Sequence, residues 1–143
     1  MALLRFGNFA VEWMRVFALQ RIAARPADGT REQLMVFVDD PGMPAGQPIA
    51  PPISEPAQIN AAWRQAAGDR RFAMLGAIAL DKAKVCAVTC NPDAKQGSVS
   101  FDLGQGRGAT VELGADHAAS ILSTIPGPKH AGAALDVAGG DLR

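Results

Sequence analysis

Apolar positions near the start of the chain fit two periods at once. At helical spacing, residues 9–24 collect one apolar face, made of Phe9, Trp13, Val16 and Phe17. Glu12 and Arg15 then lie on the opposite side, as in an amphipathic helix. The same stretch also alternates as a strand would, and Gly7-Asn8 before it fits a hairpin turn. We expect a helix over 9–24 and keep a strand with a preceding hairpin as the alternative.

Residues 25–42 indicate a buried strand between two turns. The hexapeptide RPADGT (25–30) has the proline, aspartate and glycine of a turn. The run EQLMVFV (32–38) is apolar on both faces, which predicts a strand that is covered on both sides. Asp39-Asp40-Pro41-Gly42 ends that strand, so the two carboxylates are expected to serve the turn.

A proline-rich stretch follows. Residues 39–56, DDPGMPAGQPIAPPISEP, hold six of the ten prolines of the chain. Proline has a fixed φ and no N–H donor, which predicts extended polyproline geometry. We expect residues 41–56 to form an extended arm within a single structural domain. The arm would join an N-terminal helix and strand (1–40) to a β-rich core with short helices (57–143).

The clearest helix covers residues 56–67. Ser54 is the expected N-cap, and Pro56 stands in the first turn, where proline is tolerated. The expected buried stripe is Ile59, Ala62, Trp63 and Ala66. Gly68 is expected to close the helix in the left-handed conformation.

Strand patterns dominate from Arg71 onward. RFAMLGAIAL (71–80) and VCAVTC (85–90) are expected to form a hairpin, and the β-branched residues weigh against a single helix over 72–90. Residues 98–103 and 109–113 alternate cleanly and predict a half-solvated antiparallel pair. The side chains expected to face inward are Val99, Phe101 and Leu103.

The last elements are shorter. Asp116 is the expected cap of a helix over 117–125, which Pro126-Gly127-Pro128 ends, and AALDVA (133–138) is expected as a final edge strand. Together the patterns predict an α+β fold with an antiparallel β-rich core. That core would have about five or six short strands, sandwich- or barrel-like, with two or three helices and the extended arm.

Composition narrows the class of protein. Of 143 residues, 48% are hydrophobic and 20% charged, with 14 basic and 14 acidic side chains spread over both halves. A chain without a basic cluster is not expected to bind nucleic acid. Near-zero net charge removes the repulsion that keeps copies apart. No run fits a signal peptide or a membrane span, so we expect a virion or cytoplasmic protein.

The sequence gives little indication of a disulfide, a metal site or a phosphate site. Cys86 and Cys90 are too far apart in a strand for a disulfide, so both are expected as free thiols. Together with His117 and His130 they have the atoms for zinc but a poor spacing, so neither a metal nor another cofactor is expected. The glycine-rich run 104–108 leads into a strand, which indicates a hairpin loop and not a phosphate site.

The sequence also gives little indication of a catalytic site. Ser120 follows His117 by about one helical turn, which permits a contact, but no third group orients the pair. We therefore expect no catalytic residue and no enzymatic activity.

These observations favour an assembly subunit that contacts copies of itself or a larger protein lattice. By architectural analogy, a phage capsid decoration protein or a tail accessory fits. The alternatives are a small α+β enzyme or ligand-binding domain, and an adaptor that binds one protein through the proline-rich arm. The expected partner contacts are Phe9, Trp13, Phe17, Pro44, Pro48, Ile49, Pro51, Pro52 and Ile53.

Overall fold

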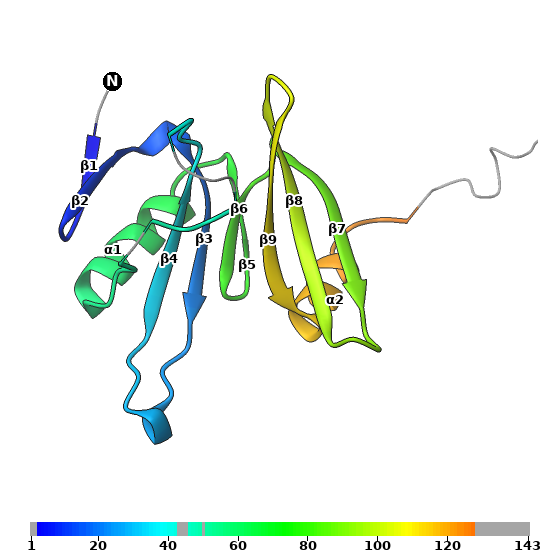
Figure 1. Ribbon diagram of the computed structural model, residues 1–143, viewed down its shortest axis with the longest axis horizontal. Coiled ribbons are helices and arrows are strands. Elements are labelled where there is room, and N and C mark those ends of the chain that lie inside the picture. The colour runs from blue at the N-terminus through cyan, green and yellow to red at the C-terminus, as the bar shows by residue number, and fades with distance from the viewer. Residues whose placement is uncertain (1–2, 43–45, 50, 128–143) are drawn as a thin grey trace, which may run out of the picture.

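The computed structural model describes residues 3–42, 46–49 and 51–127 (Figure 1). The chain is β-rich with two α-helices and two 3-10 turns in these ranges, which confirms the α+β class. The elements are β1 (Leu3–Phe6), β2 (Phe9–Glu12), η1 (Trp13–Arg15), β3 (Val16–Ile22), η2 (Pro26–Asp28), β4 (Gln33–Val38), α1 (Pro56–Ala67), β5 (Phe72–Leu75), β6 (Ile78–Asp81), β7 (Val85–Asn91), β8 (Gln96–Gly104), β9 (Arg107–Gly114) and α2 (Ala115–Ser123).

These strands form three antiparallel sheets, with more strands than the five or six expected. The β1–β2 hairpin stands alone, a four-stranded sheet has the order β4-β3-β6-β5, and a three-stranded sheet has the order β7-β8-β9. In Figure 1, α1 and the β1–β2 hairpin lie on one side of the four-stranded sheet, and the three-stranded sheet lies on the other.

Two clusters of buried side chains separate these layers. The first core joins α1 and the β1–β2 hairpin to one face of the four-stranded sheet. Its buried members are Phe6, Val11, Trp13, Val16, Leu19, Leu34, Val36, Ile53, Ile59, Ala62, Ala66, Phe72 and Ala79. The second core joins the opposite face to the three-stranded sheet and α2. Its buried members are Phe17, Ala18, Phe37, Ile78, Leu80, Val99, Phe101, Ala109, Val111, Leu113, Ala118 and Ile121. The finer expectation of a sandwich or barrel stays a prediction.

The helix expected over 9–24 is wrong, and the alternative is correct. A hairpin turn at Gly7, whose φ is +66°, joins β1 to β2, and the rest of the stretch is η1 and β3. Strand β3 is the second strand of a sheet with a core on each face, so Val16–Leu19 are all buried. Burial on both faces removes the alternation that marks a strand, which is why the helical period stood out.

The predicted turn over 25–30 and the predicted strand after it are confirmed. The turn over 25–30 is present, with Gly29 at φ +68° and a bridge between Arg25 and Thr30. Strand β4 is covered on both faces as expected, because Leu34 belongs to the first core and Phe37 to the second.

Helix α1 forms where it was expected, but its ends differ from the prediction. Glu55, and not Ser54, occupies the N-cap position, and no side chain caps the helix. Gly68 ends it with φ −86°, which is right-handed. Helix α2 likewise begins after Gly114 without a side-chain cap, and Asp116 lies in its first turn. At the start of α1, Pro56 has no N–H that needs a partner, and the Gln58 N–H donates to Glu55 O at 3.0 Å, so fewer donors are left for a side-chain cap to satisfy.

Strands form over 72–91, but the pairing differs from the hairpin expected. The turn falls inside the first segment, at Gly76 with φ +65°, and joins β5 to β6. Strand β7 crosses to the other sheet and pairs with β8. The pair β8–β9 is as predicted, with Val99 and Phe101 buried. The edge strand expected over 133–138 lies outside the described residues.

The described part of the proline-rich stretch lies along β4. Ile53 and Leu34 exchange two backbone hydrogen bonds of 2.8 and 3.0 Å, and Ile49 N donates to Val36 O at 2.8 Å. The Ile53 side chain is 4% exposed, within the first core. The expectation of an arm that extends from the body is therefore not confirmed for these residues.

Candidate functional site

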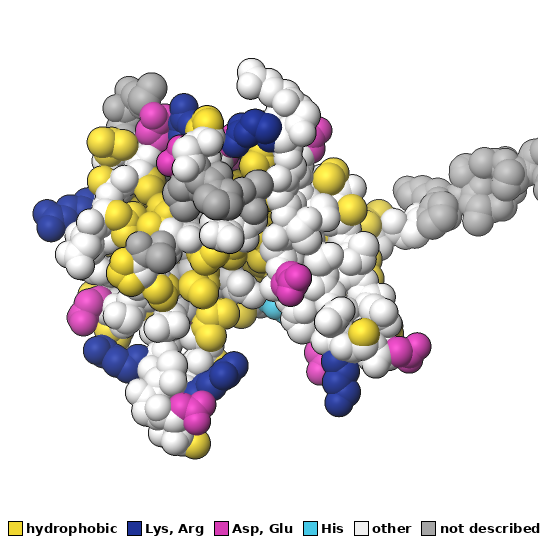
Figure 2. All heavy atoms as spheres, in the orientation of Figure 1, with side chains coloured by type: hydrophobic (Ala, Val, Ile, Leu, Met, Phe, Trp, Pro, Cys, Tyr) yellow, Lys and Arg dark blue, Asp and Glu magenta, His cyan; other side chains and the backbone are white. Residues whose placement is uncertain are grey.

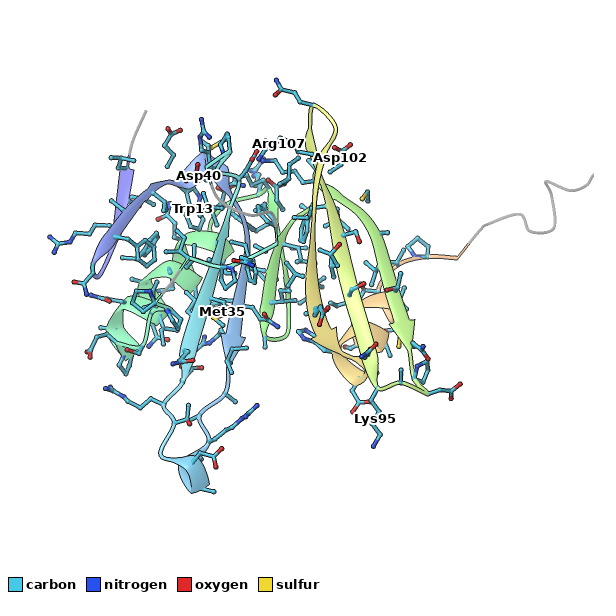
Figure 3. The ribbon with its side chains drawn as sticks, viewed as in Figure 1. Trp13, Met35, Asp40, Lys95, Asp102 and Arg107 are labelled. Carbon is cyan, nitrogen blue, oxygen red and sulfur yellow. The ribbon has the colours of Figure 1, made fainter. Side chains whose placement is uncertain are left out.

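The two larger sheets meet along two sides, and the first side is closed by the chain itself. There the edge strands are β4 and β9. Arg107, at the start of β9, forms an ion pair with Asp39 after β4. Gly46, with φ +84°, lies so near β9 that a Cβ would come 2.9 Å from Thr110 O. Figure 3 shows Arg107 at the same end of the molecule as Asp40. We call this side, which residues 39–42 and 46–49 form together with β9, the closed side.

The opposite side has the edge strands β5 and β7, and an apolar groove of about 250 Å³ lies there. We call this the open side. Its lining residues are Ala73, Leu75, Leu80, Lys82, Val85, Val88, Ile121, Thr124 and Ile125. Leu80 and Ile121 are buried members of the second core, so the floor of the groove is continuous with that core. The groove therefore exposes part of an otherwise closed apolar layer.

Helix α2 bounds the groove at one end, and two contacts fix it there. Gly97 of β8 is buried, and a Cβ at this position would clash with Ala118 of the helix. His117 Nε2 lies 2.9 Å from Leu75 O. Since a carbonyl only accepts, Nε2 donates, and the hydrogen bond ties α2 to the end of β5. The helix leads directly into Ile125, which is 49% exposed at the end of the groove.

The most buried ion pair of the described ranges joins Arg71 to Asp81, and its contacts stabilise the fold. Arg71 N–H groups donate to Asp81 Oδ2 at 2.8 Å, to Val16 O at 2.7 Å and to Trp13 O. The guanidinium also lies 4.4 Å from the Phe72 ring centroid. With these partners the cation holds β5 and β6 to the segment that enters β3.

Asp69 belongs to the same cluster. Burial raises the pKa of its carboxyl, but hydrogen bonds from Trp13 Nε1, at 2.9 Å, and from the Arg71 backbone lower it, as does the Arg71 charge. The net effect is a pKa below the ordinary value of 3.8. The group is a carboxylate at neutral pH and accepts hydrogen bonds without acting as a base.

The partner contacts expected from the sequence fall into three groups. Trp13, Phe17 and Ile53 are buried in the cores of the single chain, at 7%, 1% and 4% exposure. Pro44 lies outside the described residues. The remaining positions are partly or fully exposed: Phe9, Pro48, Ile49, Pro51 and Pro52.

Four of these expected contacts come together in one place. Phe9, Pro51, Pro52 and Ile53 line a hollow of about 270 Å³. It lies between the β1–β2 turn and the start of α1, and its lining also includes polar Asn8, Ser54, Glu55 and Gln58. On the face in Figure 2, apolar side chains gather over α1 and β4. The hollow is more polar than the groove on the open side, and no cation lines it.

The chemical candidates do not assemble into a site in the ranges that the structure describes. Cys86 and Cys90 are free thiols, and Cys90 Sγ lies 3.4 Å from Ala115 O. His117 bonds to Leu75 O, as described, while His130 lies outside the described residues. Within 3–42, 46–49 and 51–127, no three His, Cys, Asp or Glu side chains cluster as ligands of a metal would. Residues 104–108 form the β8–β9 hairpin turn, as expected.

No protein-family model matches the chain, and neither a curated protein nor a solved structure matches it. Of the helices in the described ranges, neither α1 nor α2 is long and apolar enough to cross a membrane.

Sequence reasoning missed the groove. Val85, Val88 and Ile121 are apolar positions of the expected strand and helix, but such positions do not show which strands lie at a sheet edge. That depends on the pairing order, which places β5 and β7 last in their sheets.

Proposed function

We propose that the chain is a non-enzymatic assembly subunit that contacts further copies of itself through the open side. The observation that carries the proposal is the apolar groove between two edge strands, β5 and β7, which pair with no further strand in the described ranges. Unpaired backbone groups beside an apolar surface are a template for another chain.

The alternatives have less support. A small-molecule site needs convergent polar groups within a concave pocket, whereas Lys82 is the one charged residue that lines the groove. An adaptor that binds through the proline-rich stretch would present Ile49 and Ile53, but both donate backbone hydrogen bonds to β4 of the same chain. A capsid decoration protein or a tail accessory remains the finer proposal, by analogy of architecture alone.

Light scattering of the full chain over a concentration series tests the proposal. We expect a defined oligomer that Ile125→Glu dissociates, because a charge at the end of the groove cannot be desolvated cheaply. Ser123→Glu is the matched control, since Ser123 is also exposed near the end of α2 but does not line the groove. Both variants change exposed side chains, so their unfolding midpoints should match the parent when all three chains are measured at a concentration low enough to be monomeric.

A chain that stays monomeric at every concentration would contradict self-assembly. So would an oligomer that both variants weaken equally, because the contact would then not involve the groove.

A further inference from the structure

We propose that the groove on the open side receives the segment of residues 133–138 of a neighbouring copy as an added β-strand. The inference rests on the proposed function and names the part of the partner that enters the groove. The segment lies outside the described residues, so the argument uses its sequence and the geometry of the groove.

The groove has the features that strand addition requires. It runs between β5 and β7, whose outer edges are unpaired in the described ranges, and added strands gain main-chain hydrogen bonds from such edges. Apolar side chains line it from both strands: Ala73 and Leu75 from β5, and Val85 and Val88 from β7. Alternate side chains of a strand lie on one face, so an occupant needs apolar residues at every second position.

The sequence AALDVA meets that requirement. If the segment forms a strand, Ala133, Leu135 and Val137 fall on one face, and Ala134, Asp136 and Ala138 fall on the other. Six residues span about 20 Å as a strand, which is longer than the four residues of β5 and close to the seven of β7. Glycines flank the segment at 132 and 139, which sets its ends.

Charge also matches between the groove and the segment. Lys82 is exposed and is the charged residue that lines the groove, while Asp136 is the charged residue of the segment. With Leu135 and Val137 toward the floor, Asp136 lies on the outer face, where an exposed lysine at the rim can reach it. Such a rim pair fixes register more than it adds affinity.

The connection between the end of α2 and the segment is long enough to allow exchange between copies. Ile125 lines the groove of its own chain, and seven residues separate it from Ala133. At about 3.3–3.6 Å per residue that connection spans at most roughly 25 Å. A neighbour whose groove adjoins the end of α2 lies within this distance.

Disulfide trapping in the full chain tests the proposal. In a background with Cys86→Ser and Cys90→Ser, one chain carries Val88→Cys and a second carries Leu135→Cys. Mixed and oxidised, they should give a crosslinked heterodimer on a denaturing gel. Asp136→Cys replaces Leu135→Cys in the control mixture, and it should crosslink several-fold less because it lies on the outer face.

The outcomes separate this inference from the proposed function. A heterodimer that forms only with Leu135→Cys supports strand exchange. No heterodimer, in a sample that light scattering shows to be oligomeric, overturns the strand exchange and leaves the assembly function standing. A monomeric sample without a heterodimer overturns both. One chain that carries both cysteines and crosslinks only within itself overturns the exchange between copies.

A charge swap gives a second, independent readout. Lys82→Glu and Asp136→Lys should each weaken association about two- to fivefold at low salt, and the double variant should recover most of that loss. Loss without recovery would mean that the two residues do not meet.

Discussion

The four-stranded and three-stranded sheets meet along two sides, and these sides differ in whether another segment of the described chain covers the edge strands. On the closed side, residues 46–49 and 51–53 lie against β4, and Asp39 pairs with Arg107 at the start of β9. On the open side, β5 and β7 pair with no further strand in the described ranges, and apolar side chains stay accessible between them. Unpaired edge strands can pair with other chains, so under the proposed function the open side is the one that would receive a partner.

The prolines of the closed side leave few backbone donors there for a further strand. Ile49 and Ile53 supply the backbone donors that reach β4, while Pro48, Pro51 and Pro52 around them have none to offer. A segment of this kind covers an edge without presenting a new one. Strands β5 and β7 contain no proline. Strand β7 has one register shift, between Val85 and Ala87, and the regular pairing after it includes Val88, which lines the groove.

The largest expected difference between the sides is in stability. Ile53→Ala should lower the free energy of unfolding by about 2–4 kcal/mol, because it leaves a cavity in the first core. Ile125→Ala on the open side should change it by no more than about 0.5 kcal/mol, because that side chain is half exposed. Urea unfolding of the two variants, at a protein concentration low enough for the chain to be monomeric, measures both. Equal losses would mean that the Ile125 side chain is buried within the monomer in solution.

A smaller effect should come from the ion pair on the closed side. Arg107→Met removes the partner of Asp39 and should cost about 1 kcal/mol at low salt, and less as salt screens the pair. Lys95→Met is the matched control, at the exposed β7–β8 turn, and Figure 3 shows Lys95 at the opposite end of the molecule from Arg107. A double-mutant cycle with Asp39→Asn isolates the pair. If the double variant loses the sum of the single losses, Asp39 and Arg107 act independently.

The smallest expected effect is on the pH dependence of stability, and it comes from Asp69, which lies on neither the closed nor the open side. The pKa of Asp69 is lowered in the folded chain, so its stabilising effect is complete above its ordinary value of 3.8. That contribution is lost as the pH falls through the lowered folded value. Unfolding followed by Trp fluorescence from neutral to acid pH should show a shallower decline for Asp69→Asn than for the parent, since Trp13 Nε1 donates to this carboxylate.

Asp93→Asn, at the exposed β7–β8 turn, serves as the control for that series. Because Asp69 does not line the groove, its substitution should leave association at neutral pH unchanged. A change in oligomer size would instead link the first core to the open side.

Local patterns in the sequence determined several elements. Helix α1 was predictable because Ile59, Ala62 and Ala66 repeat at helical spacing over residues that contact one core. The pair β8–β9 was predictable because one face is buried and the other is solvated, which leaves the alternation intact. In both cases a single face meets the core, so the period in the sequence reports the structure directly.

Only the tertiary structure decided the remaining parts. Strand β3 has a core on each face, so a helical period stood out in place of a strand's alternation. Its two neighbours in the sheet come from residues 33–38 and 78–81. The partner of β7 and the two uncovered edges follow from that pairing order. Backbone hydrogen bonds between strands are the same for every side chain, so they leave little trace in the sequence. The sequence by itself determined which residues are apolar and where the helices and strands with one buried face lie. Packing of distant segments decided which edges are covered and where the groove opens.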